Sequence, residues 1–281
     1  MQVITAQHAG TCYGVHRALV MAGTALEGSA SVSCLGPLIH NPQVVNRLAR
    51  QGLGVVDAPE DVTTDGVIIR SHGVPPEIRR ALEATGAHII DATCPFVRRA
   101  QEAAARLAAE HACLVIAGEE DHPEVEALRR FALEAGARVI CAAAPDDLPS
   151  DLPGCVGVVV QTTQRSSTLE AILTALEERG VGTDVANTIC NATTRRQDAA
   201  MELAAKVDAM VVVGGRNSSN TRRLAEICAD ICPNVFQIEG LDDFTDGDIA
   251  SLRACETIGL TAGASTPEDQ IRTVRLGLEA L

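Results

Sequence analysis

The sequence predicts an α/β fold built from small parallel sheets, and three features of this chain of 281 residues predict it. Short runs rich in Val, Ile and Leu alternate with amphipathic stretches from end to end, which is typical of parallel α/β structure. Proline or a capping residue follows most of these runs and indicates a helix start. Polar side chains gather at the same junctions, where open parallel sheets bind their ligands.

Six apolar runs are predicted to be buried strands, because strands of parallel sheets that are covered on both faces are apolar throughout. They are residues 67–70, 88–91, 114–117, 156–160, 210–213 and 257–260. Helices are expected to begin shortly after strands, at the following prolines and capping residues: Pro75, Pro95, Pro123, Ser218 and Thr266.

The composition excludes several classes of function. With 46% apolar and 21% charged residues the chain can bury a large core, while only 2% aromatic residues leave few platforms on which bases could stack. The chain has 37 acidic and 23 basic residues and a net charge of −14, so neither nucleic acid nor a membrane is an expected partner. An anionic ligand would therefore have to be held by local hydrogen-bond donors.

The first residues and the cysteine content indicate a cytoplasmic protein. The chain reaches a glycine-rich turn at Gly10 without room for a signal or transit peptide, and no apolar run is long enough to span a bilayer. Ten cysteines in such a chain favour thiols, metal ligands or small core residues over a disulfide framework.

Three cysteines stand apart from the other seven. Cys12, Cys94 and Cys190 lie in loops between a strand and a helix, whereas most of the others lie within apolar runs, where cysteine packs as a small hydrophobic residue. The separations of 82 and 96 positions are each close to a third of the chain, which suits three α/β units around a common centre, each with one cysteine. From spacing alone, the alternative that these three are also small buried residues stays open.

Three dispersed thiolates fit an iron–sulfur cluster better than zinc, which usually takes four ligands or a compact local motif. A 4Fe-4S cluster on three cysteines keeps one iron open.

Histidine, serine and asparagine side chains at the strand ends are candidate ligands for a phosphate group. His40, His72 and His122 lie in turns and can donate to a diphosphate, although any one of them taken alone is more often a surface or capping residue. Residues 217–220 and Ser265 each precede a helix and suit phosphate binding or ordinary capping. Glu124, in a first helical turn, can relay protons or simply face the helix dipole.

Nine short motifs occur in the order typical of one family. They are residues 10–18, 40–45, 71–74, 91–95, 122–125, 161–163, 188–193, 217–220 and 261–268. On these motifs the chain resembles, over nearly its whole length, the 4-hydroxy-3-methylbut-2-enyl diphosphate reductase family, known as IspH or LytB.

The resemblance implies a role for each candidate residue. Cys12, Cys94 and Cys190 would ligate the 4Fe-4S cluster, Glu124 would supply protons, and Thr162 would lie beside the substrate hydroxyl. The substrate diphosphate would be bound by the remaining candidates: His40, His72, His122, Ser218, Ser219, Asn220 and Ser265. The implied reaction is reductive removal of the allylic hydroxyl, which gives isopentenyl and dimethylallyl diphosphate in the last step of the non-mevalonate isoprenoid pathway, with a ferredoxin- or flavodoxin-type electron donor.

The resemblance also implies a three-lobed cloverleaf of pseudo-three-fold-related parallel-sheet units around a central iron–sulfur cluster. We expect lobes at residues 13–93, 94–189 and 190–268, with residues 1–12 and 269–281 packed near the centre. Two departures from the family pattern concern Thr11, where Phe often precedes the first cysteine, and Ala127, near which a glycine is usual. The alternatives are a three-cysteine enzyme resembling quinolinate synthase and an iron–sulfur sensor.

Overall fold

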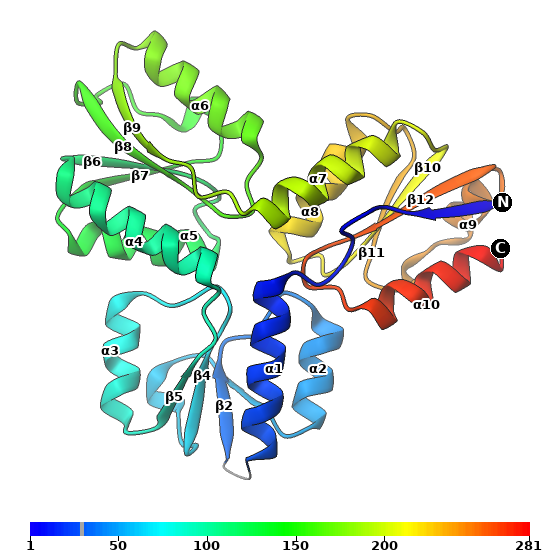
Figure 1. Cartoon of the computed structure of the whole chain (residues 1–281), viewed down its shortest axis with the longest axis horizontal. Coiled ribbons are helices and arrows are strands. Elements are labelled where there is room, and N and C mark those ends of the chain that lie inside the picture. Colours follow the sequence, from blue (N-terminus) through cyan, green and yellow to red (C-terminus); the bar gives the residue numbers. More distant parts are fainter. Residues whose placement is uncertain (29–30) are drawn as a thin grey trace. The chain divides into compact units, whose positions relative to one another are not determined.

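The computed structural model describes residues 1–28 and 31–281, and its twelve strands form three four-stranded sheets (Figure 1). Every strand pairing among these residues is parallel. The predicted α/β fold with small parallel sheets is therefore confirmed. None of the helices in the described part of the chain combines the length and apolar character needed to cross a membrane.

The first sheet has the strand order β3-β2-β4-β5. Its strands are β2 (Val32–Leu35), β3 (Gly54–Val56), β4 (Gly66–Ile69) and β5 (His88–Asp91). Its helices are α1 (Tyr13–Glu27), α2 (Pro42–Arg50), α3 (Pro76–Thr85) and the short 3-10 helix η1 (Pro59–Asp61).

The second sheet has the order β7-β6-β8-β9. Its strands are β6 (Cys113–Ala117), β7 (Arg138–Ala142), β8 (Cys155–Val160) and β9 (Gly182–Ala186). Its helices are α4 (Pro95–Glu110), α5 (Pro123–Glu134), α6 (Ser166–Glu178) and the 3-10 helix η2 (Pro145–Asp147).

The third sheet has the order β1-β12-β10-β11. Its strands are β1 (Gln2–Thr5), β10 (Ala209–Val213), β11 (Val235–Ile238) and β12 (Thr257–Ala262). Its helices are α7 (Asn191–Ala204), α8 (Ser219–Ala229), α9 (Asp246–Arg253), α10 (Glu268–Glu279) and the 3-10 helix η3 (Leu241–Asp243).

The three sheets share one topology. With the strands of a sheet numbered in the order in which they follow one another, the second strand lies at one edge. The first, the third and the fourth strands follow it across the sheet. In the third sheet the fourth strand is β1, which comes from the start of the chain and pairs with β12 from Gln2↔Thr257 to Thr5↔Leu260. Figure 1 shows this dark blue strand beside the orange one. The repeat is thus one of topology, although the sequence shows no matching repeat of residues.

The chain forms two compact units. The first contains residues 1–15, 40–44 and 191–281 and carries the third sheet, and the second contains residues 16–39 and 45–190 and carries the other two sheets. The terminal elements β1 and α10 belong to the third sheet and its helices. The lobe boundaries expected from the sequence, and a location of the termini near a centre, stay predictions.

All six predicted apolar runs are strands, and five of them are central strands of their sheets: β4, β6, β8, β10 and β12. The sixth, β5, is an edge strand with partly exposed side chains, so the prediction that it is buried was wrong. An edge strand has a neighbour on one side only, which leaves its side chains more open to water.

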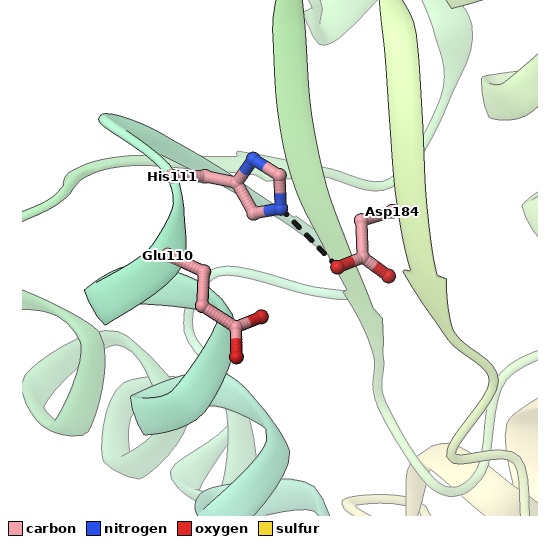
Figure 2. Close-up of side chains that lie close together, drawn as sticks. All are labelled: Glu110, His111 and Asp184. Carbon is pink, nitrogen blue, oxygen red and sulfur yellow. Dashed lines mark hydrogen bonds and ion pairs between the residues drawn. The ribbon is translucent and has the colours of Figure 1, made fainter.

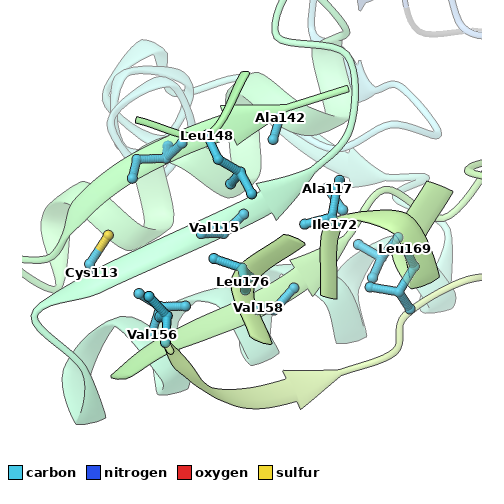
Figure 3. Close-up of a cluster of buried hydrophobic side chains, with 13 residues drawn as sticks. Cys113, Val115, Ala117, Ala142, Leu148, Val156, Val158, Leu169, Ile172 and Leu176 are labelled. Atoms are coloured by element: carbon cyan, nitrogen blue, oxygen red, sulfur yellow. The ribbon is translucent and has the colours of Figure 1, made fainter. Parts of the chain in front are cut away.

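The central strands of the second sheet are apolar on both faces because each face packs in a core. Alternate residues of β6 point to opposite sides, as period-two geometry requires. Val115 packs in one core with Val158, Ile172 and Leu176, beneath α6 (Figure 3). The intervening residue Ile116 packs in another core with side chains of α4 and α5.

We predict that Leu176→Ala lowers the free energy of unfolding by about 2–5 kcal/mol, because it leaves a cavity in a fully buried core. Leu133→Ala is the matched control, since Leu133 also lies on a helix of this sheet but is 42% exposed and should change stability by about 0.5 kcal/mol or less. Urea unfolding followed by circular dichroism measures both. Equal effects would contradict the described core.

Candidate active site

The candidate site residues occupy equivalent places in the three sheets, just beyond the carboxyl ends of the strands. Candidates of the same kind follow corresponding strands of the three sheets. The first strands are followed by His40, His122 and residues 218–220, the third strands by His72, Thr162 and Ser265, and the fourth strands by Cys94, Cys190 and Cys12. This is the edge at which open parallel sheets bind ligands.

The backbone N–H of each cysteine donates to the loop that follows the third strand of the same sheet. Cys12 N donates to Ala264 O at 3.1 Å, Cys94 N to Ser71 O at 3.0 Å, and Cys190 N to Thr162 O at 3.0 Å. Two of these acceptors immediately precede candidate substrate ligands, Ser265 and His72, and the third is itself a candidate. The same bond therefore ties each candidate metal ligand to a candidate substrate-binding loop.

The candidate residues are divided between the two compact units. The first unit contains Cys12, His40, residues 218–220 and Ser265, and the second contains Cys94, Cys190, His72, His122, Glu124 and Thr162.

In the first unit, His40 and Ser265 are held together by backbone contacts. Ser265 Oγ donates to His40 O at 2.9 Å, and Asn41 Nδ2 donates to Ser265 O at 2.9 Å. A Cβ atom at Gly215 would lie only 2.6 Å from His40 O, so this close approach requires glycine. The turn that carries His40 is thus anchored to the loops after β10 and β12.

The N-terminus of α8 combines capping with an unsatisfied donor. Ser218 is the N-cap, and its Oγ accepts from Thr221 N at 3.3 Å, so this serine does act as a cap. Asn220 is 5% exposed, and its Nδ2 has no hydrogen-bond partner among the described residues. Since buried polar groups are nearly always satisfied, this donor makes the start of the helix a candidate ligand position.

In the second unit, Glu124 and Thr162 form a buried pair. Glu124 is 2% exposed, and its two carboxylate oxygens accept from Thr162 N at 2.6 Å and Thr162 Oγ1 at 2.7 Å. His122 caps α5, and its Nδ1 accepts from Glu124 N at 3.1 Å. The His72 and His122 rings meet edge to face, with centroids 5.7 Å apart. Four candidate residues therefore form one cluster.

Burial changes the acidity of Glu124. Loss of solvent raises the pKa of its carboxyl group from 4.5 to about 7, and the two hydrogen bonds from Thr162 oppose part of this rise. Near neutral pH the group therefore populates both its protonated and its ionised form, as suits proton transfer at that pH.

The three candidate cysteines differ from the rest in their surroundings. Each is a half-buried thiol directly before a helix, where the positive end of the helix dipole favours anionic groups. By contrast, burial raises the pKa of the Cys34 and Cys228 thiols to about 12. Those two pack as core residues, as expected, whereas Cys155 is exposed at the start of β8.

The two departures from the family pattern have local explanations. Thr11 Oγ1 donates to Thr266 O at 3.0 Å, so the hydroxyl ties the Cys12 loop to the loop after β12. Ala127 is fully buried within α5, where alanine favours the helix by about 1 kcal/mol over glycine.

Two supporting residues were not among the sequence candidates. Asn41 links the His40 turn to Ser265, and Gln161 accepts from Glu119 N at 3.0 Å through its side chain, which holds the segment before His122. Asn41 lies in the motif at residues 40–45 and Gln161 in the motif at residues 161–163, and only the fold shows that both side chains are buried.

A separate group of possible metal ligands lies on the second sheet: Glu110, His111 and Asp184 (Figure 2). His111 Nε2 is 3.2 Å from Asp184 Oδ2. Arg106 Nη1 lies 2.7 Å from a Glu110 oxygen and 3.9 Å from an Asp184 oxygen, so a cation already accompanies both carboxylates. We assign the group to surface ion pairing, with His111 as the C-cap of α4.

Comparison with known proteins identifies relatives of the whole chain. The family model described as LytB protein matches residues 3–279. The 4-hydroxy-3-methylbut-2-enyl diphosphate reductase of Trichlorobacter lovleyi is 43% identical over 270 residues, which cover 95% of this chain and 94% of the relative. The protein of the same name from Aquifex aeolicus is 38% identical, with 100% and 97% covered.

Two solved structures are also similar to the chain. One, described as (E)-4-hydroxy-3-methyl-but-2-enyl diphosphate reductase, the terminal enzyme of the non-mevalonate pathway, has a TM-score of 0.70 at 38% identity and 99% coverage of both chains. The corresponding reductase from Plasmodium falciparum has a TM-score of 0.85 at 27% identity, with 96% of this chain and 85% of that chain covered.

We predict that Glu124 makes the stability of the folded chain depend on pH. Its folded pKa of about 7 lies above the unfolded value of 4.5, so the folded state binds the extra proton and loses stability as pH rises through 7. Glu124→Gln lacks this titration. Relative to that variant, the free energy of unfolding of the wild-type protein should fall by on the order of 2–3 kcal/mol between about pH 5 and pH 8.

Urea unfolding at several pH values measures this difference. Glu134→Gln changes an exposed carboxylate of the same helix and should leave the pH profile of the wild type nearly unchanged. Parallel profiles for wild type and Glu124→Gln would show that burial does not raise the pKa of Glu124.

Proposed function

The chain belongs to the LytB family, and we propose that it reduces 4-hydroxy-3-methylbut-2-enyl diphosphate to isopentenyl and dimethylallyl diphosphate, the last step of the non-mevalonate isoprenoid pathway. The reaction replaces a carbon–oxygen bond by a carbon–hydrogen bond, consumes an electron pair and two protons, and releases water. It therefore needs an electron-transferring centre, an acid near the hydroxyl and an anchor for the diphosphate.

The main structural support for the residues assigned below is the hydrogen bond from each cysteine N–H to the loop after the third strand of its sheet. It occurs once in each of the three sheets. Because in each sheet it couples a thiol to a loop with substrate-binding candidates, it supports cluster ligation and substrate binding by neighbouring residues of the same sheet.

We assign cluster ligation to Cys12, Cys94 and Cys190. Their thiol donors fit an iron–sulfur centre, and each lies before a helix start, where a negative charge is favoured. When bound on three thiolates, a 4Fe-4S cluster supplies electrons and one open iron that polarises the allylic hydroxyl. The remaining cysteines are less suited, since four of the seven, Cys34, Cys113, Cys228 and Cys232, are buried.

We assign diphosphate binding to hydrogen-bond donors at the strand ends. The residues are His40, His72, His122, Ser218, Ser219, Asn220 and Ser265. The buried, unsatisfied Nδ2 of Asn220 supports this role, as do the N–H groups at the start of α8. Such donors hold an anion without a basic surface, in keeping with the net charge of −14. Anchoring the diphosphate positions the distant hydroxyl group for reaction.

Glu124 and Thr162 are the proposed route for protons. In its protonated form, Glu124 donates to Thr162 Oγ1, which reverses the hydrogen bond that the ionised form accepts. The Thr162 hydroxyl then turns its own proton toward the substrate oxygen, which leaves as water. A carboxyl group with a pKa of about 7 is suited to give up and regain this proton at neutral pH.

The remaining parts of the proposal concern partners and organisation. We propose a ferredoxin- or flavodoxin-type electron donor, a cytoplasmic location, and lobes at residues 13–93, 94–189 and 190–268 around the cluster. The family match over residues 3–279 favours the reductase over an enzyme of quinolinate-synthase type or an iron–sulfur sensor.

We predict that the protein, purified and reconstituted without oxygen, binds iron and sulfide and, with a reductant, forms both C5 diphosphates. Cys94→Ser should lose the visible absorbance of the cluster and the activity, because a thiolate ligand is missing. Cys155→Ser, which changes an exposed thiol at the start of β8, is the control and should keep both. Absence of both products from the loaded wild-type protein would refute the substrate assignment.

We predict that Glu124→Gln keeps the absorbance of the cluster but lowers kcat by about 100-fold or more, the loss expected when an acid catalyst is removed. Thr162→Val should have an effect of the same order, because it removes the hydroxyl between Glu124 and the substrate. Thr162→Ser restores that hydroxyl and should recover most of the activity. Steady-state kinetics measures all three, and full activity of Glu124→Gln would exclude this route.

A further inference from the structure

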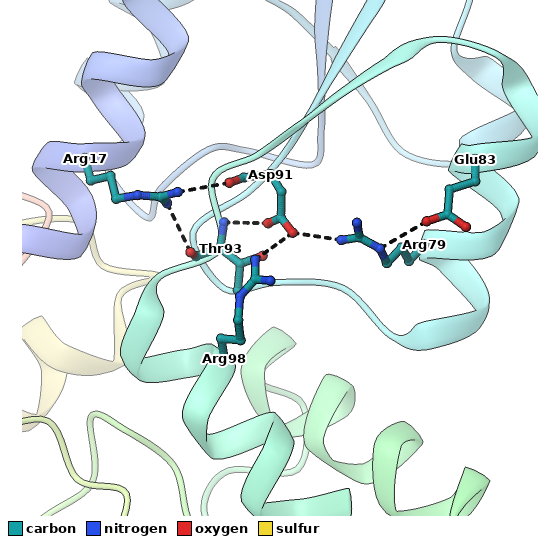
Figure 4. A network of polar contacts seen from close by, with 6 residues as sticks. All are labelled: Arg17, Arg79, Glu83, Asp91, Thr93 and Arg98. Carbon is teal, nitrogen blue, oxygen red and sulfur yellow. Dashed lines mark hydrogen bonds and ion pairs between the residues drawn. The ribbon is translucent and has the colours of Figure 1, made fainter.

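The loop before Cys94 is held by an arginine from α1. Arg17 Nη1 donates to Thr93 O at 3.2 Å and Arg17 Nη2 donates to Asp91 O at 3.4 Å (Figure 4). The guanidinium thus spans two carbonyl groups, one of them on the residue directly before the cysteine. A planar group with several fixed donors is well suited to such bridging.

The Asp91 side chain makes the same loop more rigid. Its Oδ1 accepts from Thr93 N at 3.0 Å, and its Oδ2 accepts from Arg79 and Arg98, both at 2.8 Å (Figure 4). Hydrogen bonds from Thr93 and Arg79 keep the pKa of Asp91 below its usual value, despite partial burial. Since other donors already occupy this carboxylate, Arg17 remains on the two carbonyl groups.

The loop before Cys12 accepts one hydrogen bond from an arginine of α7, whose second hydrogen bond stays within that helix. Arg196 Nη2 donates to Gly10 O at 2.8 Å and Arg196 Nη1 donates to Ala192 O at 3.1 Å, with the arginine only 3% exposed. Gly10 has a φ of +93°, and a Cβ atom there would lie 2.7 Å from Ile271 Cδ1. The loop therefore has little freedom to adopt another conformation.

Both arginines lie in helices that begin directly after a candidate cysteine. Arg17 is the fifth residue after Cys12, and Arg196 is the sixth residue after Cys190. The loop that each arginine contacts belongs to a different cysteine from the one that precedes its own helix. Arg17 contacts the Cys94 loop, and Arg196 contacts the Cys12 loop. Through the chain, Cys190 is linked by α7 and Arg196 to the Cys12 loop, and Cys12 by α1 and Arg17 to the Cys94 loop.

From this arrangement we infer that Arg17 and Arg196 are positioning residues that fix the Cys94 and Cys12 loops, so that each thiolate is oriented before the iron–sulfur cluster binds. The inference rests on the proposed function, since it takes these cysteines as the ligands. Hydrogen bonds behind the ligands of a metal commonly orient them and contribute to affinity.

The first test uses the full-length protein freed of iron and measures alkylation of each cysteine by mass spectrometry. Arg17→Met removes the two bonds to the Cys94 loop and should speed alkylation of Cys94 by about tenfold while leaving Cys12 nearly unchanged. Arg196→Met should give the reverse pattern. Arg275→Met, on the exposed side of α10, is the control and should change neither rate.

The buried cysteines separate positioning from a loss of structure. If either arginine only stabilises the fold, its replacement should expose Cys34, Cys113 and Cys228 together with the two loop thiols. Uniform acceleration, or no change at either loop cysteine, would overturn the inference. Lysine keeps the charge and one donor, so Arg17→Lys and Arg196→Lys should recover part of the protection.

The second test measures transfer of iron from the anaerobically reconstituted protein to a chelator. Either methionine variant should release iron about 10–100-fold faster than the wild type, the range typical for loss of a residue that orients a metal ligand. Wild-type release rates in both variants would overturn the inference. If the wild-type chain takes up no cluster, the proposed function fails, whereas the alkylation pattern still decides whether the arginines fix the loops.

Discussion

The hydrogen bond between each cysteine N–H and the loop after the third strand is the constraint on which the site depends. Its repetition follows from the strand order, because the third and fourth strands are neighbours in every sheet. Loops that leave the same edge of neighbouring parallel strands emerge side by side, and their free backbone groups need partners. One bond thus satisfies the backbone and brings a thiol next to a loop that carries candidate substrate-binding residues.

The chemistry of the site depends on burial more than on charge. In this acidic chain with few aromatic residues, the candidate anion site consists of hydroxyl, amide and imidazole groups, and the candidate acid, Glu124, is a carboxyl group whose pKa is raised by loss of solvent. Arg17 and Arg196 donate to backbone carbonyl groups in the loops that precede Cys94 and Cys12. A guanidinium group that donates to backbone carbonyl groups restrains a loop without taking part in ligand binding.

The sequence predicted the central strands well and the edge strands poorly. Strands such as β8 and β10 are apolar throughout because helices cover both faces, and this makes them visible in the sequence. Edge strands such as β3 and β9 are short or partly exposed, so their residues resemble those of loops. The three cysteines, the histidine turns and the helix starts were predicted for a related reason: each lies at a sharp change from apolar to polar residues.

The sequence by itself determined the fold class, the family and the set of candidate residues, because apolar periodicity, helix starts and local motifs are properties of neighbouring residues. Only the tertiary structure decided that β1 completes the third sheet, that Glu124 is buried against Thr162, and that Arg17 and Arg196 hold the cysteine loops. These features join residues far apart in the chain, and both desolvation and hydrogen bonding depend on distances in space that no local pattern encodes.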